Sequence, residues 1–482
     1  MHLSQGPLDR IFSPESVVFL GPSNKMTNMA TGQLLTTMSG GFKGDIFVVH
    51  PKEEKVLGIK TYRRLADLPK PVDLAVMVLP TRIVAQTLTE CGEKGIKRVI
   101  ISSAGFREVG GEGHKLEKEI AEIADRYGIR FVGPNCIGVC NMEEGLCTTW
   151  FVPQKTGHVS LVSQSGTYIS HTMPYLSRLG FGIAKTISVG NEANIDIVDC
   201  LEYLGDDSQT KAIALYIEGI KRGKEFIDVA RKVTRKKPVV ALYVGGSEAG
   251  ARSGSSHTGA LSGPDEIYNR IFKQCGVLRA GTLEDLYDWT LALATQPLPK
   301  GRRIAILSNS GGPATSMADT CIKIGMEVPE FSTDLQSKIK EFTFPWASSR
   351  NPIDLTFNLG DVAPFYKNIP EILLNSPEVD GVLVYGVFGT YAFKLLKDMA
   401  MGKLDISLTD MEASMTGLCE EFAKIPHILG KPILGSSFFS REEEPLIALL
   451  EDRDIPIYPS PDRASKAMAA LCRYAEVKRN EY

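Results

Sequence analysis

The 482-residue sequence has no continuous apolar run of about 18 residues, the length that a membrane-spanning helix requires. Its N-terminal stretch, MHLSQGPLDRIFSPESVVFLG, also lacks the charged segment followed by an apolar segment that is typical of a signal peptide. We therefore expect a cytoplasmic protein with no part in the membrane.

The sequence has little excess charge, since its formal net charge is −3. Such a balance gives no electrostatic reason to expect binding to nucleic acid or to an anionic membrane. Its nine cysteines are scattered singly and form no CxxC pair. Cys136, Cys140 and Cys147 come closest to a metal-ligand spacing, but no second Cys/His pair accompanies them. We expect reduced, buried thiols and no bound metal.

One pattern recurs along the chain: a short β-branched run, then a Gly/Ser/Pro turn, then a helical stretch. Apolar runs of four to six residues indicate strands covered on both faces, and hence parallel sheets with crossover helices. In such sheets ligands bind at the carboxyl ends of the strands, where these turns lie. The runs are Ser16–Leu20, Leu74–Leu79, Arg98–Ile101, Phe131–Val132, Val159–Val162, Ala212–Ile217, Val239–Val244, Arg303–Leu307 and Gly381–Tyr385.

The length exceeds that of one ordinary core, so several domains are expected. The strand–helix rhythm lapses at Asn141–Lys155, and at Gln296–Arg302 two prolines and a basic turn precede a fresh strand. We therefore predict an α/β protein with three doubly wound domains, at residues 1–145, 146–298 and 299–482.

Two Ser/Gly-rich loops each follow a strand and precede a helical stretch: LVSQSGT and ILSNSGGPA. Exposed amides and hydroxyls at a helix N-terminus form a site for an anion. Either loop alone is also consistent with a plain turn, but two of them favour a phosphate-handling enzyme. A serine hydrolase is disfavoured because Val162 breaks the GxSxG pattern. The candidate phosphate-binding residues are Ser163, Ser165, Gly166, Thr167, Ser310, Gly311 and Gly312.

Gly245–Gly263 reads GGSEAGARSGSSHTGALSG, with Leu261 as its one large apolar residue. Such a segment buries too little apolar surface to offset the entropy of ordering, so we expect a mobile loop. It carries one imidazole, His257. A metal ligand would need further ligands nearby, and a general base would normally sit on a rigid element. A covalent carrier of a phosphoryl group fits this composition best.

Glu218 directly follows the apolar run AIALYI. A carboxylate at the carboxyl end of a strand faces the expected site and is suited to orienting an imidazole. The alternative is a helix cap or a solvated acid. In the first domain, Gly21 ends a strand and would allow a phosphate to approach the backbone, and Lys52 would reach a phosphate; a tight turn and a solvated lysine are the alternatives.

In this order, the motifs GPS, VHP, SSAGF, GPNC, SQSGT, SVGNEANID, YIEG, SGSSHTG, SNSGGP and NPIDLT are highly specific together. The chain resembles over its full length the α subunit of ADP-forming acetyl-CoA synthetases, the nucleoside-diphosphate-forming acyl-CoA ligases related to succinyl-CoA synthetase. The resemblance implies a Rossmann-like CoA-binding domain followed by two flavodoxin-like ligase domains. Two departures stand out, Pro22 where the family often has alanine and His50 where it often has asparagine.

The resemblance also implies the chemistry. An acyl-CoA and phosphate give an acyl phosphate and free CoA, and His257 takes the phosphoryl group and passes it to ADP. Glu218 matches the acid that steadies the phosphohistidine, and Asn191 and Glu192 match a loop that lines the substrate site. The residues carried over as CoA contacts are Gly21, Ser23, Lys52 and Asn135.

Three domains account for the whole chain, so the ATP-grasp domain that holds ATP or ADP and Mg²⁺ in this family is expected on a separate β-type subunit. The resemblance then implies an α2β2 heterotetramer that acts on CoA and a small carboxylic acid. One alternative is a catalytically inactive CoA- or acyl-CoA-binding regulatory protein of the same fold. A further alternative is a carbamoyl- or acyl-transferring relative, which would have no use for a mobile histidine.

Overall fold

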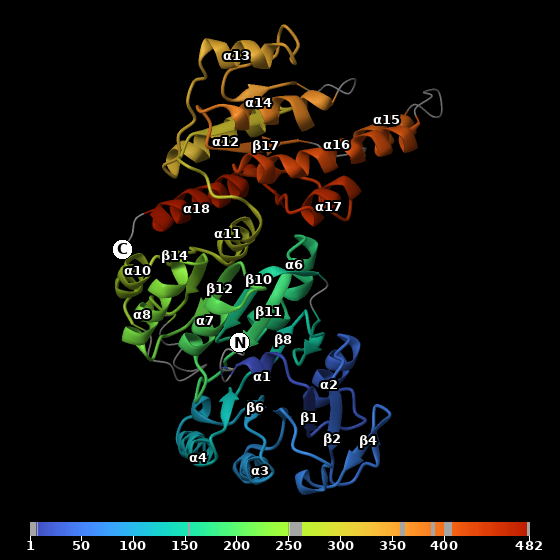
Figure 1. Cartoon of the computed structure of the whole chain (residues 1–482), viewed down its shortest axis with the longest axis vertical. Coiled ribbons are helices and arrows are strands. Elements are labelled where there is room, and N and C mark those ends of the chain that lie inside the picture. Colours follow the sequence, from blue (N-terminus) through green and yellow to red (C-terminus); the bar gives the residue numbers. More distant parts are fainter. Residues whose placement is uncertain are drawn as a thin grey trace, which may run out of the picture. The chain divides into compact units, whose positions relative to one another are not determined.

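The computed structural model describes residues 6, 8–152, 155–248, 250, 263–356, 362–386, 391–399 and 407–479. The chain forms two compact units, Met1–Ser177 with Gly182–Ala280, and Arg178–Phe181 with Gly281–Tyr482. Three sheets organise these units, two in the first and one in the second (Figure 1). The predicted α/β class with doubly wound parallel sheets is confirmed.

The first sheet has the strand order β3-β4-β2-β1-β5-β6-β7 and is parallel except for β3. Its order reverses between β1 and β5, so the ends of these strands form the crevice where such folds bind ligands. Helices α3 and α4 pack side by side (Figure 1). The strands are β1 (Ser16–Leu20), β2 (Asp45–Val49), β3 (Lys55–Val56), β4 (Ile59–Tyr62), β5 (Leu74–Met77), β6 (Arg98–Ile101) and β7 (Arg130–Val132), and the helices are α1 (Asp9–Phe12), α2 (Met29–Ser39), η1 (Leu65–Asp67), α3 (Thr81–Glu93), η2 (Arg107–Val109) and α4 (Glu112–Tyr127).

The second sheet has the order β14-β13-β12-β10-β11-β8-β9. Its five parallel strands run 2-1-3-4-5 in chain order, which is the flavodoxin arrangement, and the antiparallel strands β8 and β9 extend one edge. The strands are β8 (Val139–Asn141), β9 (Leu146–Cys147), β10 (Thr156–Ser163), β11 (Ile183–Ser188), β12 (Ala212–Ile217), β13 (Val239–Tyr243) and β14 (Leu278–Arg279), and the helices are α5 (Thr167–Ser170), α6 (Met173–Arg178), α7 (Ile197–Asp206), α8 (Gly223–Thr234) and α10 (Asp265–Gln274).

The third sheet repeats the 2-1-3-4-5 arrangement in the order β16-β15-β17-β18-β19, all parallel. Its strands are β15 (Ile304–Ser308), β16 (Ile353–Asp354), β17 (Gly381–Tyr385), β18 (Ile433–Ser436) and β19 (Ile457–Tyr458). The helices of this unit are α11 (Leu283–Thr295), α12 (Gly311–Lys323), α13 (Thr333–Lys340), η3 (Pro364–Asn368), α14 (Ile369–Asn375), α15 (Tyr391–Met399), α16 (Leu408–Leu429), α17 (Pro445–Asp452) and α18 (Pro461–Arg479).

Apolar strands explain these sheets. Every residue of β1, β12 and β15 is buried, and so are the last five residues of β10, because helices cover both faces of the sheets. One hydrophobic cluster runs from α1 and β1 through to β13 and α10, so the first two sheets share a core. The domain limits 1–145, 146–298 and 299–482 stay a prediction. None of the described helices is both long and apolar enough to cross a membrane.

Candidate functional site

The two Ser/Gly-rich loops have the same internal geometry. In the first unit Ser163 Oγ donates to the carbonyl oxygen of Ser165 at 2.7 Å and accepts from its N–H at 3.1 Å. In the second unit Ser308 Oγ donates to the carbonyl oxygen of Ser310 at 2.7 Å and accepts from its N–H at 3.0 Å. Each serine pair closes a tight turn at the carboxyl end of the central first strand of its flavodoxin-like sheet, where ligands bind.

The helices after these loops differ in length. In the second unit Ser310 is the N-cap of the 13-residue helix α12, whose first residues Gly311 and Gly312 are exposed. That helix supplies free N–H groups and a positive dipole end for an anion. In the first unit Gly166 is the N-cap of α5, which starts at Thr167 and has four residues. There the dipole is small, and an anion would depend on the turn's own N–H groups and hydroxyls.

Glu218 lies beside the first of these loops. It follows β12, which pairs with β10 so that Ser163 is opposite Tyr216. The residue is 6% exposed, and its backbone N–H donates to Gln164 Oε1. The predicted acid and the predicted phosphate loop therefore meet at the switch point of the second sheet.

Asn191 is fully buried, and both hydrogens of its side-chain amide have carboxylate partners. It donates to Glu108 Oε2 at 2.6 Å and to Glu117 Oε2 at 2.8 Å, and its Oδ1 accepts from Asn135 Nδ2 at 3.3 Å. Burial alone would raise the pKa of Glu108, but hydrogen bonds from Asn191 and from backbone N–H groups hold that pKa below its usual value. Asn191 thus ties the second sheet to the loops of the first, and its contact with substrate stays a proposal.

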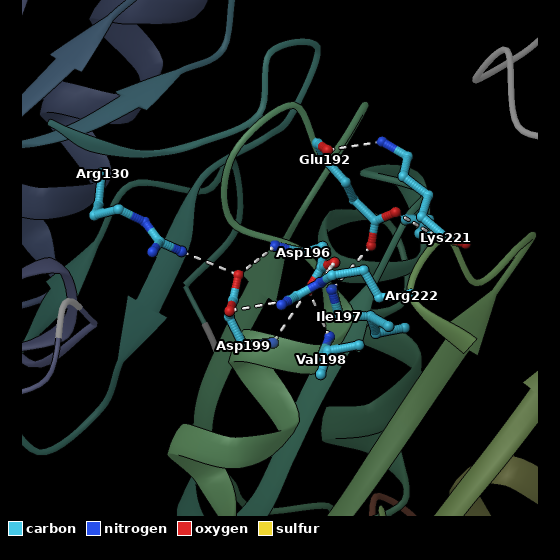
Figure 2. Close-up of polar contacts among 9 residues, drawn as sticks. Arg130, Glu192, Asp196, Ile197, Val198, Asp199, Lys221 and Arg222 are labelled. Carbon is cyan, nitrogen blue, oxygen red and sulfur yellow. Dashed lines mark hydrogen bonds and ion pairs between the residues drawn. The ribbon is translucent and has the colours of Figure 1, made fainter. Parts of the chain in front are cut away.

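Glu192 has a left-handed backbone, with φ of 53°, and the residue is 6% exposed. Its oxygens accept from Gln164 Nε2 at 2.8 Å and from the N–H of Ile197 at 3.0 Å. Burial raises the pKa of this carboxyl to about 7. Lys221 Nζ donates to the carbonyl oxygen of Glu192 at 2.7 Å (Figure 2) and also to that of Asn191 at 2.7 Å. Burial lowers the pKa of Lys221 to about 8.

An ion-pair network of two arginines and two aspartates lies at the start of α7, directly after the 191–192 loop. The guanidinium of Arg222 meets Asp196 through two nitrogens and Asp199 through one, and Arg130 reaches Asp199 from the other side at 3.1 Å (Figure 2). Asp196 also caps α7, since its Oδ1 accepts from the N–H of Val198 at 2.9 Å. This network holds the start of α7 and the loop before it in place.

His257 lies outside the described residues, but residues on both sides of its segment contact one another. Tyr243, at the end of β13, donates its hydroxyl to the carbonyl oxygen of Gly263 at 2.7 Å. The Tyr243 ring stacks on Tyr268 with centroids 3.6 Å apart, and the Tyr268 hydroxyl accepts from the N–H of Ile220 at 3.0 Å. The flanks of the His257 segment are therefore tied to the turn that carries Glu218.

The first sheet carries a cavity of about 510 Å³ at its switch point. Gly21 lies in the cavity wall with φ of 102°, and a Cβ there would approach the carbonyl oxygen of Val78 to 2.2 Å, so only glycine fits. Arg63, Arg64 and Lys94 also line this cavity. Glu90 and Glu93 line it as well, so the cavity carries charges of both signs beside its apolar wall.

The structure does not bring all four predicted CoA residues to this cavity. Ser23 closes the turn after Gly21, since its N–H donates to Thr31 Oγ1 at 3.0 Å. Lys52 is exposed, next to cavity-lining Pro51. Asn135 contacts Asn191 instead, as described above.

Sequence reasoning missed several residues that the structure places at these sites. The Arg-Arg pair that directly follows β4 was a usable signal, because a strand's carboxyl end faces the ligand crevice. Lys221 gave a similar signal, because it lies three residues after Glu218, in the segment that follows the carboxyl end of β12. Gln164 and Lys94 gave none, because their roles depend on which strands and helices become neighbours. The missed residues are Arg63, Arg64, Lys94, Gln164 and Lys221.

All nine cysteines are free and buried. Cys140 lies opposite Cys147 in the β8–β9 pair. Within the described ranges, no group of three or more His, Cys, Asp and Glu side chains could hold a metal ion.

Comparison with known proteins agrees with this geometry. Residues 15–142 match the family model of a CoA binding domain, and residues 156–293 match that of a succinyl-CoA ligase like flavodoxin domain. The α subunit of acetate–CoA ligase (ADP-forming) II from Pyrococcus furiosus is 38% identical over 469 residues, covering 97% of this chain and 98% of that protein. The crystal structure of PH0766 from Pyrococcus horikoshii OT3 superposes with a TM-score of 0.84 at 34% identity, covering 98% of this chain and 99% of that one.

Some relatives are longer. The 4-hydroxybutyrate–CoA ligase (ADP-forming) of Nitrosopumilus maritimus is 35% identical over 474 residues, and the match covers 97% of this chain but 64% of that protein.

The fold and the two matched domains define a CoA-binding subunit of an acid–CoA ligase, an enzyme that forms carbon–sulfur bonds. Because the identity of 38% extends over nearly the whole of both chains, the chain belongs to the α subunits of the ADP-forming acetate–CoA ligases.

Proposed function

We propose that the chain interconverts acyl-CoA, ADP and phosphate with a carboxylic acid, ATP and CoA through an acyl phosphate and a phosphohistidine at His257. One observation carries this proposal: Gln164 of the Ser163–Thr167 loop accepts a hydrogen bond from the backbone N–H of Glu218. The residues on either side of the His257 segment are hydrogen-bonded close to the same turn. A phosphate loop, an acid and a nucleophile are the groups that phosphoryl transfer to an imidazole needs, and the first two lie together at the switch point of the second sheet.

In the first step a phosphate oxygen attacks the thioester carbonyl, the carbon–sulfur bond breaks, and CoA leaves as a thiolate. The first-domain cavity would hold CoA, with Gly21 giving close backbone approach and Arg63 meeting its phosphates. Arg64 pairs with Asp67, and Lys94 Nζ donates to the carbonyl oxygens of Ala66 and Leu68, so these two cations would have to share their donors with the ligand. Ser23 and Lys52 would contribute at the rim, and we propose that Asn135 acts at the 191–192 loop.

In the second step an imidazole nitrogen of His257 attacks the phosphorus, and the bond to the acyl oxygen breaks to release the carboxylate. Glu218 would orient the imidazole and stabilise its positive charge. The phosphate would be held by the Ser163–Thr167 turn, and the helix start at Ser310–Gly312 is a second candidate anion site within its own unit. The 191–192 loop would line the acyl side of the site.

The nucleotide half of the reaction is assigned to a partner. A relative that this chain matches over 98% of its length is named as a subunit α, whereas a relative whose name gives no subunit is about half as long again. We therefore propose a β subunit of ATP-grasp type that binds ADP and Mg²⁺ in an α2β2 assembly. The acid is a small carboxylate, with acetate favoured by the names of the relatives.

Phosphoryl labelling tests this proposal. The full chain is incubated with acetyl-CoA and radiolabelled phosphate, and separately with ATP labelled at the γ-phosphate, Mg²⁺ and the copurified partner. We expect an acid-labile, base-stable label at His257 from either side, and none in His257→Ala. Failure of the wild type to label, or equal labelling of His257→Ala, would contradict the proposal and favour the inactive CoA-binding protein.

Glu218→Gln tests the acid. This variant should accumulate less phosphohistidine while its thermal unfolding temperature stays near that of the wild type. Labelling at the wild-type rate and level would remove Glu218 from the mechanism.

A further inference from the structure

The side-chain amide of Gln164 has a partner for each of its hydrogens and lone pairs. The residue is 4% exposed. Its Oε1 accepts from the N–H of Glu218 and, at 3.1 Å, from the N–H of Gly219. Its Nε2 donates to the carbonyl oxygen of Gly219 at 2.7 Å and to Glu192 Oε2 at 2.8 Å. One side chain thus joins the ends of β10 and β12 to the loop after β11.

The direction of this amide follows from its partners. Two N–H donors face Oε1, and two oxygen acceptors face Nε2, so the reverse orientation would set donors against donors. An ionised glutamate at this position would accept from the N–H groups of Glu218 and Gly219, but it would have no hydrogen to donate to Glu192 or to the carbonyl oxygen of Gly219. Methionine would fill a similar volume but would neither accept these hydrogen bonds nor donate any. Glutamine is the residue of this size that serves both sides.

We propose that Gln164 is a positioning residue for phosphoryl transfer, because its side chain fixes the Glu218–Gly219 turn against Glu192 and so sets where the Glu218 carboxyl is held. This inference rests on the proposed function of Glu218. Since its four hydrogen-bonding positions are used within the protein, Gln164 acts through Glu218 and does not bind the phosphate itself.

The Gln164→Glu variant has a distinct expected behaviour. It places a second buried carboxyl against Glu192, whose pKa burial already raises to about 7. Lys221 and Asp196 are the other charged groups that act on Glu192, with opposite effects on its pKa. Two carboxyls in contact favour sharing one proton. That proton restores a donor between them. The pair holds it at neutral pH and releases it only as the pH rises, so the variant should lose rate toward alkaline pH.

The test compares the rate of phosphohistidine formation from acetyl-CoA and radiolabelled phosphate across a pH series. We expect Gln164→Met to be roughly 100-fold slower than wild type at every pH, the cost of a misplaced catalytic group. Gln164→Glu should approach this loss only at alkaline pH, where the carboxyl pair gives up its shared proton. The phosphate concentration for half-maximal rate should change little. Only Gln164→Glu should slow further, relative to wild type, as the pH rises above about 7. Gln209→Glu is the matched control, because Gln209 Nε2 also donates to a carboxylate, that of Glu143, but on the surface.

The outcomes separate the two proposals. A wild type that does not label contradicts the proposed function. A wild type that labels, with Gln164→Glu equal to it in rate and pH profile, contradicts the positioning role. A slow Gln164→Glu with the same pH profile as Gln164→Met and a matching fall in thermal unfolding temperature also contradicts it, since a general loss of structure would then suffice. If Gln164→Met does not fold, the isosteric Gln164→Glu decides alone.

Discussion

Tyr243 donates its hydroxyl hydrogen to the carbonyl oxygen of Gly263, 2.7 Å away. Tyr243 is the last residue of β13. Gly263 directly follows residues 251–262, which the structure does not describe. The bond therefore joins the two flanks of the segment that contains His257. Burial raises the pKa of the Tyr243 hydroxyl to about 12, so it is a donor throughout the working pH range.

Tyr243→Phe removes this bond and leaves the ring stack on Tyr268 in place. Loss of one such hydrogen bond costs about 1 kcal/mol, so we expect phosphohistidine formation to slow by roughly fivefold while the fold is retained. Rapid-quench labelling with acetyl-CoA and radiolabelled phosphate measures the rate. An unchanged rate would show that the anchor at Gly263 is not needed for the reaction.

Gly21→Ala should disrupt the CoA-binding turn. The added Cβ would lie 2.2 Å from the carbonyl oxygen of Val78, at a φ of 102° that L-residues rarely adopt. We expect a loss of about 2–4 kcal/mol in unfolding free energy and weaker CoA binding.

Gly58→Ala is the matched control, because its φ of 82° is also unfavourable but no atom lies within 4 Å of the added Cβ. It should cost about 1 kcal/mol and leave CoA binding unchanged. Denaturant unfolding and calorimetric titration with CoA measure both effects. Equal effects of the two substitutions would mean that backbone strain alone, and not the close approach to Val78, constrains position 21.

Asp196→Ala should destabilise the chain more than a surface ion pair would predict. Asp196 is buried, caps α7 and pairs with Arg222 through two nitrogens. Burial would raise the pKa of Asp196, but hydrogen bonds from Arg222 and the backbone lower it overall. The stabilisation is thus present at neutral pH and is lost as the pH falls through the folded-state pKa.

We expect Asp196→Ala to lower the unfolding free energy by about 2–4 kcal/mol at pH 7. Asp206→Ala is the control, since Asp206 pairs with Lys236 on the surface and should contribute less than about 1 kcal/mol. Urea unfolding at pH 7 measures the difference. Similar values for the two variants would show that the network shapes the loop without stabilising it.

Much of the fold could be predicted because its strands are local features. The runs Ser16–Leu20, Arg98–Ile101, Ala212–Ile217 and Gly381–Tyr385 became strands with those limits. The stretch Asn141–Lys155 gave no strand signal, yet Asn141 ends β8, which pairs antiparallel with β11. That pairing is set by the neighbouring sheet and not by an apolar run of its own.

The positions of Glu218 and the two serine turns at strand ends were predictable, because one residue type at a strand end carries that signal. Their roles in the reaction stay a prediction. It was not predictable where side chains from distant segments converge. Gln164 was inside a recognised motif, but its contact with Glu192 requires that β10 and β11 be neighbours and that Glu192 take a left-handed backbone. Asn191 was assigned to substrate, and nothing local to it indicates the acids of the first domain that hold its amide.

Glu192→Gln tests how the buried carboxyl affects stability. Burial raises its pKa from 4.5 to about 7 in the folded chain. Between these pH values the unfolded chain releases the proton and the folded chain keeps it, so stability falls as the pH rises, by roughly 3 kcal/mol in total. Lys221, with a pKa lowered to about 8, changes charge mainly above this window.

Glutamine at position 192 cannot titrate, so the variant should lose this slope and keep only a pH-independent cost for one lost acceptor. The difference in unfolding free energy, wild type minus Glu192→Gln, should therefore fall steadily from pH 4.5 to about 7 and then level off. Urea unfolding at half-unit pH steps measures it. A difference that stays constant across the window would mean that Glu192 ionises as easily in the folded chain as in the unfolded one, and that its contacts with Gln164 and Ile197 offset the cost of burial.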